Sequence, residues 1–75
     1  MVKIDVEEAF ALALQNHQNN NFKIAENLYK EILEKNPNHF KSNFLLGTLL
    51  AQSKKFDEAK KFLLISTQIE PNNAQ

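Results

Sequence analysis

The chain has 75 residues, with nine lysines, no arginine and nine acidic residues, so its formal charge is zero. A neutral chain without arginine lacks the basic footprint of a nucleic-acid binder, and the absence of cysteine excludes disulfides and thiolate metal sites. Hydrophobic residues make up 43% of the chain, whereas glycine occurs once and proline twice. This composition predicts a single domain, residues 1–75, that is built from long helices.

The first helix is expected to begin near Asp5. An aspartate at this place can cap free amides, and Glu8 follows three residues later, as in a capping box. Apolar residues then recur at helical spacing over residues 6–14. The polar run over residues 16–21 ends this helix, and its asparagines suit a tight turn because asparagine tolerates left-handed backbone.

A second helix is predicted over about residues 22–35, where apolar residues again form a stripe. Lysines near its C-terminus, Lys30 and Lys35, complement the helix dipole. Pro37 is expected to end the helix because proline disfavours helical backbone at the preceding residue, Asn36.

Two more helices are predicted in the second half of the chain. The third runs over about residues 39–53 with Asn38 as its cap, and Lys54 and Lys55 form the next turn. The fourth begins at residue 56 or 57, runs to residue 70 and is ended by Pro71. Because the connections are short, successive helices are expected to be antiparallel neighbours.

The chain also repeats itself at an offset of 34 residues. The matched positions are mostly apolar, small or turn residues, as a repeated packing unit requires. They pair Phe10 with Phe44, Leu12 with Leu46, Ala13 with Gly47, Gln18 with Gln52, Phe22 with Phe56, Ala25 with Ala59, Pro37 with Pro71 and Asn38 with Asn72. The units span about residues 6–39 and 40–73.

In these positions the chain resembles the tetratricopeptide repeat family. The resemblance is carried by Leu12, Ala13, Phe22, Ala25, Tyr29 and Pro37 in the first unit and by Leu46, Gly47, Phe56, Ala59, Leu63 and Pro71 in the second. Ala13 and Gly47 are small enough to let the two helices of a hairpin approach each other, and Phe22 and Phe56 are expected to wedge the turn side of each hairpin. The sequence departs from the family pattern where Ala9 and Asn43 replace an early aromatic residue, where Asn16 replaces an aromatic or aliphatic residue, and where Asn20 and Lys54 replace a turn glycine.

The resemblance implies an all-α fold in which antiparallel helical hairpins stack as a short right-handed α-solenoid of four helices. An unrelated four-helix bundle is the alternative. The implied function is a non-enzymatic protein–protein interaction module, a scaffold or adaptor that binds a peptide or helix in an apolar concave groove. By register, the groove would be lined by Glu7, Phe10, Ala11, Leu14, His17, Lys41, Phe44, Leu45, Thr48 and Ala51. Alternatively, Phe10 and Phe44 only pack on each other.

The fourth helix carries more apolar residues than one hairpin is expected to bury. We therefore predict a self-association face formed by Phe62, Leu64, Ile65 and Ile69. Residues 6–39 have a net charge of −2 and residues 40–73 of +2, and this asymmetry favours pairing of copies of the chain. Alternatively, the charged residues only form solvated faces. The alternative function is a homo-oligomerising or regulatory N-terminal fragment of a larger protein, such as a transferase.

Catalytic, cofactor and metal sites are not expected. His17 and His39 are 22 residues apart, without a carboxylate at metal-ligand spacing, and the single glycine excludes a glycine-rich phosphate loop. The lysines at 54, 55, 60 and 61 are typical of a solvated face rather than an RNA site. Without a membrane-length apolar run or the apolar core of a signal peptide, we expect a cytoplasmic protein that binds neither membrane nor nucleic acid.

Overall fold

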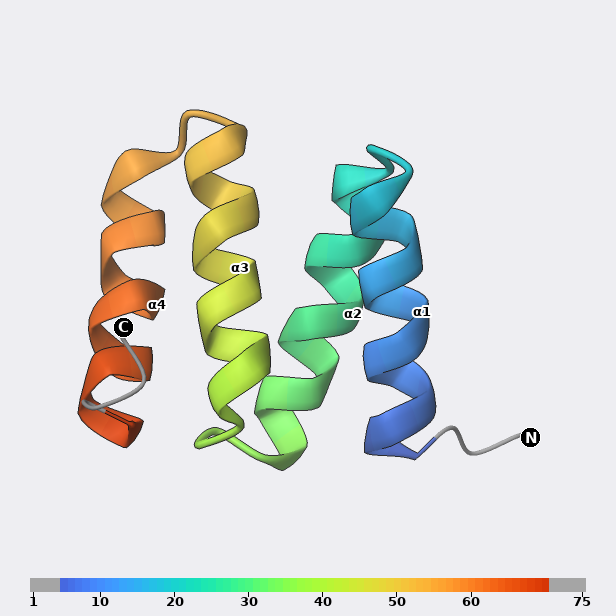
Figure 1. The fold of residues 1–75 in the computed structure, drawn as a ribbon, viewed down its shortest axis with the longest axis horizontal. Coiled ribbons are helices and arrows are strands. Elements are labelled where there is room, and N and C mark those ends of the chain that lie inside the picture. Colours follow the sequence, from blue (N-terminus) through green and yellow to red (C-terminus); the bar gives the residue numbers. More distant parts are fainter. Residues whose placement is uncertain (1–4, 71–75) are drawn as a thin grey trace.

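A computed structural model of the chain describes residues 5–70, which form four helices. They are α1 (Val6–Gln18), α2 (Phe22–Lys35), α3 (Phe40–Gln52) and α4 (Phe56–Ile69). The helices lie side by side in chain order, each antiparallel to the one before it, so that α1 with α2 and α3 with α4 form two hairpins (Figure 1). The predicted all-helical fold of stacked hairpins is confirmed.

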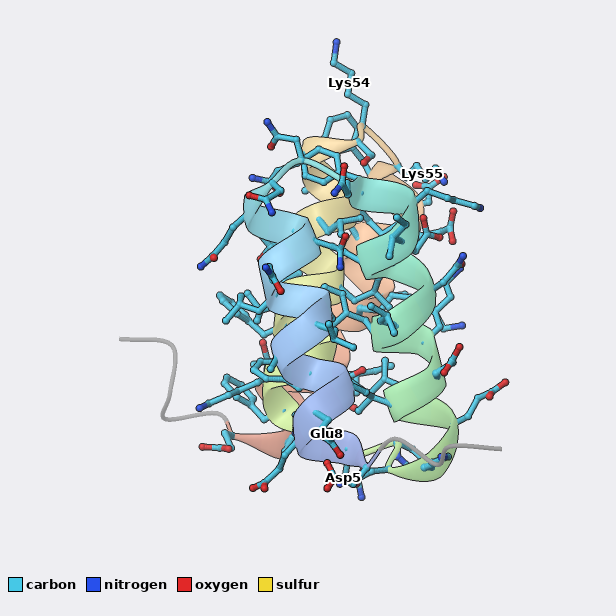
Figure 2. The ribbon with its side chains drawn as sticks, turned by 90° about the vertical axis from the view of Figure 1, so that its right-hand side faces the viewer. Asp5, Glu8, Lys54 and Lys55 are labelled. Carbon is cyan, nitrogen blue, oxygen red and sulfur yellow. The ribbon has the colours of Figure 1, made fainter. Side chains whose placement is uncertain are left out.

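The start of α1 and the turn within each hairpin follow the sequence prediction. The backbone amide of Glu8 donates to the Asp5 carboxylate at 2.8 Å, and the two residues lie together at the start of the helix (Figure 2). Asn20 and Lys54, which hold the same position in the two hairpins, both have a φ of 64°. The turn therefore requires left-handed backbone at this position, which explains why a glycine is usual there.

The predicted cap of α3 is wrong by one residue. His39, rather than Asn38, is the N-cap, and its ring nitrogen Nδ1 accepts a hydrogen bond from the backbone amide of Ser42 at 3.2 Å. The His39 ring also packs on the Phe10 ring, with 5.5 Å between centroids. This tertiary contact favours His39 over the better intrinsic cap, asparagine. The predicted helix stop at Pro71 lies outside the described residues.

Small residues allow the helices of each hairpin to pack closely. One contiguous cluster of buried residues consists of Ala13, Ala25, Tyr29, Leu46, Leu49, Leu50 and Ala59. At Gly47, an added Cβ would lie 2.7 Å from Cγ of Leu63 and 3.2 Å from the carbonyl oxygen of Ala59. The absence of a side chain at Gly47 therefore sets the distance between α3 and α4.

The two wedge phenylalanines differ in their burial. Phe22 packs on the core and makes an edge contact with the His17 ring at 5.7 Å. Phe56 is 64% exposed, so the prediction that it wedges the turn of the second hairpin is wrong. In the second repeat Ala51 stands in the place of His17 and cannot make this edge contact, and no described helix covers α4 as α3 covers α2.

Polar side chains join the two hairpins where a larger aromatic residue is usual. Asn43 is buried, and its amide nitrogen donates to the carbonyl oxygens of Pro37 at 3.0 Å and of His39 at 3.1 Å. These bonds satisfy carbonyl groups in the connection between α2 and α3. The substitution therefore replaces aromatic packing by hydrogen bonding that orders this connection.

Candidate protein-binding surface

The predicted groove residues lie on α1 and α3, the first helices of the two hairpins. Glu7, Ala11 and Lys41 are exposed, and Phe44 is 46% exposed. The remaining predicted residues are partly buried: Phe10, Leu14, His17, Leu45, Thr48 and Ala51. The surface is therefore mainly apolar, with one acidic and one basic group at equivalent positions, Glu7 and Lys41.

His17 ties together three of the four helices. Its Nε2 lies 2.7 Å from the amide oxygen of Gln52 on α3, and its Nδ1 lies 3.1 Å from the hydroxyl of Tyr29 on α2. The Gln52 oxygen can only accept, so Nε2 of His17 is the donor in this contact, and in that tautomer Nδ1 accepts from the phenol. This bridge links the turn ends of α1 and α3, at one end of the predicted groove.

Burial keeps the Tyr29 phenol in its neutral, donating form. The side chain is fully buried, and loss of solvation raises the pKa of Tyr29 to about 12. The sequence showed Tyr29 as one of the residues that carry the repeat pattern but did not predict its link to His17 and Gln52. In the sequence, Gln52 stood out only because it matches Gln18 in the 34-residue repeat.

The structure separates the roles of the two equivalent phenylalanines. The Phe10 ring packs against Tyr29 at 6.2 Å and against His39 at 5.5 Å, so it belongs largely to the core. The Phe44 ring instead stacks on Phe40 at 5.9 Å with an interplanar angle of 11°. The aromatic contacts of the described residues thus join each phenylalanine to its own neighbours, and Phe44 is the more accessible ring.

Neighbouring polar groups on α3 are already satisfied. The hydroxyl of Thr48 donates to the carbonyl oxygen of Phe44 at 2.9 Å, so it turns back onto its own helix. Leu45 packs against the core. The part of α3 that is available to a ligand is therefore the Phe40–Phe44 stack together with the exposed Lys41.

The residues predicted as a self-association face on α4 are not equally accessible. Leu64 is 54% exposed, whereas Phe62 packs on the core and Ile65 and Ile69 are partly buried. In the first repeat the positions equivalent to Phe62, Ile65 and Ile69 line a hollow between α1 and α2. By this register Phe62, Ile65 and Ile69 lie along the seam of their own hairpin, and self-association through this helix stays a prediction.

Acidic Glu26 is a further feature that the sequence did not single out. Its side chain is 8% exposed, and its carboxylate lies 2.8 Å from Nζ of Lys30 on the same helix and 3.7 Å from Nζ of Lys55 of the second hairpin. The hydrogen bond from Lys30 lowers the pKa of Glu26, although burial opposes this effect. Figure 2 shows Lys54 pointing away from the helices, whereas Lys55 lies on the side where it meets Glu26.

Within residues 5–70, no cluster of three or more histidine and acidic side chains is arranged to hold a metal ion. In the same part of the chain, none of the helices combines the length and the apolar character that crossing a membrane requires.

The stacked helical hairpins and the 34-residue period define a class of repeat proteins that bind partners through exposed helix faces. The profile of the tetratricopeptide repeat family matches residues 16–75, and the chain belongs to this family. Members of the family are generally protein–protein interaction modules and are typically non-catalytic. A search of the curated proteins found no significant match.

Proposed function

We propose that this protein is a scaffold or adaptor that binds a peptide or helix of another protein across the groove formed by α1 and α3. The observation that carries the proposal is the Phe40–Phe44 stack. Phe44 remains 46% exposed although it lies on a helix whose opposite side is fully packed. A half-exposed aromatic ring on a rigid helix is a favourable anchor because binding does not have to order it.

Contacts with neighbouring residues hold two of the residues that line the proposed groove, Phe10 and His17, in place. Phe10 packs on Tyr29 and His39, and His17 bridges Tyr29 and Gln52. These contacts fix the spacing of α1 and α3 before any ligand binds, which lowers the entropic cost of binding. The mechanism that we propose is recognition alone, without a catalytic residue or a cofactor.

Selection of displayed peptides on the 75-residue chain tests this proposal. Selected peptides should lose at least fivefold in affinity when Phe44 is replaced by Ser, because a buried phenylalanine side chain contributes about 1.5–3 kcal/mol. Ile24→Ser is the matched control, since Ile24 is 51% exposed on α2, outside the groove. Circular dichroism establishes that both variants remain helical.

Amide chemical shifts locate the ligand independently. Bound peptide should perturb residues of α1 and α3 in preference to α2 and α4. Equal loss of binding in the Ile24 and Phe44 variants, or shifts confined to α2, would rule out the groove.

Self-association through α4 is a second candidate, and the exposure of Leu64 favours it. Sedimentation of the wild-type chain against Leu64→Glu measures it. A wild-type chain that remains monomeric at millimolar concentration would remove this candidate without affecting the groove.

A further inference from the structure

The side chain of His39 connects the start of α3 to a residue of the proposed groove on α1. As the N-cap of α3, it accepts a hydrogen bond at Nδ1 from the backbone amide of Ser42 at 3.2 Å. The same ring packs on the ring of Phe10, with 5.5 Å between the centroids. One imidazole therefore holds the first turn of α3 and covers an aromatic residue of the first hairpin.

The turn that His39 caps carries the exposed aromatic stack of the proposed groove. Phe40 follows His39 directly, and its ring stacks on that of Phe44 at 5.9 Å. The first amides of a helix have no acceptor within the helix, so this turn depends on its side-chain cap. Loss of the cap therefore loosens Phe40 against Phe44 and changes the surface that a peptide meets.

Only the neutral ring of His39 provides the cap. Nδ1 accepts from the amide of Ser42 when it carries no hydrogen, whereas both nitrogens of a protonated imidazole are donors. A protonated ring would also place a positive charge at the N-terminus of α3, where the helix dipole is positive. Protonation thus turns a stabilising cap into an unfavourable contact.

The surroundings of His39 favour the neutral form as well. Burial, and then the charge of Lys41, lower the pKa of His39 from its ordinary value of 6.5. On the side of α1 the ring meets the uncharged Phe10, and Tyr29 of α2, which also packs on Phe10, keeps its proton to about pH 12. Other charged groups at the end of the fold where α3 begins include Asp5 and Glu7 at the start of α1, Glu34 and Lys35 on α2, and Glu70 after α4 (Figure 1). Because the folded pKa is the lower one, the contribution of the neutral ring is present above pH 6.5 and is lost as the pH falls through the folded pKa.

We propose that His39 makes peptide binding in the groove sensitive to acid: its neutral ring holds Phe10 and the first turn of α3 in place, and protonation of the ring releases both. Release frees Phe40 from its place beside Phe44, and a peptide then has to order the aromatic anchor at an entropic cost. The consequence for binding rests on the proposed function, whereas the release itself is a property of the chain alone and is tested without a peptide.

Nuclear magnetic resonance of the 75-residue chain without a peptide follows the release. Between about pH 7.5 and about pH 5, the imidazole signals of His39 should titrate with a midpoint below 6.5. The amide signal of Ser42 should shift with the same midpoint, and its protection from hydrogen exchange should fall about fivefold after correction for the intrinsic effect of pH. Circular dichroism should show that the helix content is largely retained, because the release is confined to one turn.

The variant His39→Asn separates titration from capping, since asparagine caps a helix without titrating in this range. In this variant the shift and the loss of protection at Ser42 should disappear. The chain has one other histidine, His17, which the variant retains as an internal control. A change at Ser42 that persists in His39→Asn and follows the titration of His17 would overturn the proposal.

Fluorescence anisotropy with a peptide selected on the chain by display tests the consequence for recognition. The peptide is amidated and contains no histidine, aspartate or glutamate, so that the pH acts on the protein alone. Its affinity should fall about fivefold from about pH 7.5 to about pH 5 for the wild-type chain, and less than about twofold for His39→Asn. The comparison is between pH dependences, because asparagine also lacks the ring that covers Phe10.

The release and the groove fail in different ways. A Ser42 amide that does not follow His39, or a loss of helix content over the whole chain at the His39 midpoint, would overturn the release. An equal fall in affinity for the wild-type chain and His39→Asn would overturn its link to binding. Peptide-induced shifts confined to α2, with Ser42 still following His39, would rule out the groove and support the release.

Discussion

Replacing Gly47 by Ala tests whether the distance between α3 and α4 is set by a missing side chain. In an exposed helix this substitution would stabilise the protein by about 1 kcal/mol, because glycine is the poorer helix former. Here the new Cβ would lie 2.7 Å from Cγ and 2.8 Å from Cδ2 of Leu63, and 3.2 Å from the carbonyl oxygen of Ala59. The Leu63 contacts are closer than real Cβ atoms tolerate, so a side chain or a helix must move.

The magnitude follows from the atoms involved. Overpacking of this kind costs about 1–3 kcal/mol. The Cγ atom is the branch point of Leu63 and the Ala59 oxygen belongs to the backbone, so we expect the upper part of that range. After subtraction of the gain in helix propensity, Gly47→Ala should destabilise the protein by about 1–2 kcal/mol. The melting temperature should fall by about 5–15 °C for a domain of this size.

Thermal and urea unfolding, followed by circular dichroism, measure the change. Truncation of the opposing side chain is the decisive control: in a Leu63→Ala background, Gly47→Ala should become neutral or stabilising, because the clashing atoms are gone. In the first repeat the small residue is already alanine. The reverse substitution, Ala13→Gly, should therefore also lower the free energy of unfolding, by about 1 kcal/mol, because glycine is the poorer helix former. A Gly47→Ala protein that is as stable as the wild type, with Leu63 present, would refute the reasoning.

Further predictions concern buried polar and titratable groups. The buried hydroxyl of Ser42 has no hydrogen-bond partner among residues 5–70, so Ser42→Ala should stabilise the protein by about 1 kcal/mol in urea unfolding; destabilisation would mean that the hydroxyl is satisfied. Burial, and secondarily a nearby lysine, lowers the pKa of His39, whose Nδ1 must be unprotonated to cap α3. Its stabilising contribution is therefore present above its unfolded-state pKa, near 6.5, and is lost as the pH falls through the lower folded pKa. His39→Asn, which caps without titrating, should flatten the fall in unfolding free energy between about pH 7 and 5, and an unchanged slope would contradict this. Tyr29 is the sole tyrosine and there is no tryptophan. The ultraviolet absorbance of its phenolate should therefore appear near pH 12 in the folded protein, and a midpoint near 10 while the helices persist would contradict its burial. Glu26→Gln should lower the free energy of unfolding by about 0.5–1 kcal/mol at neutral pH. The expected loss is small because both lysine partners are about half exposed to solvent. It should disappear at a pH low enough to protonate Glu26. A loss that persists there would point to packing rather than charge.

The sequence by itself was sufficient for the four helices and the repeat, apart from the cap of α3. The Asp5 cap, the boundaries of α2 and the two turns rest on signals within a few residues, and these act before any tertiary contact forms. The period of 34 residues follows from recurring small and apolar positions, and it identified the family that the profile match establishes. Local chemistry and periodicity are properties of the chain itself, so they can be read without coordinates.

Only the tertiary structure decided how equivalent residues differ. Phe10 and Phe44 align in the repeat, yet His39 and Tyr29 cover the first and Phe40 stacks on the second. The burial of a side chain depends on the elements that pack against it. Those neighbours differ because α3 covers α2, whereas within residues 5–70 nothing covers the equivalent face of α4.

The same physical reason explains the polar contacts that the sequence did not predict. The bridge from His17 to Tyr29 and Gln52 joins residues up to 35 positions apart, and Glu26 meets Lys55 across the two hairpins. A repeat pattern records which positions pack alike, but not which side chains from distant segments come within hydrogen-bonding distance. That depends on the stacking angle and spacing of the hairpins, which only the folded structure determines.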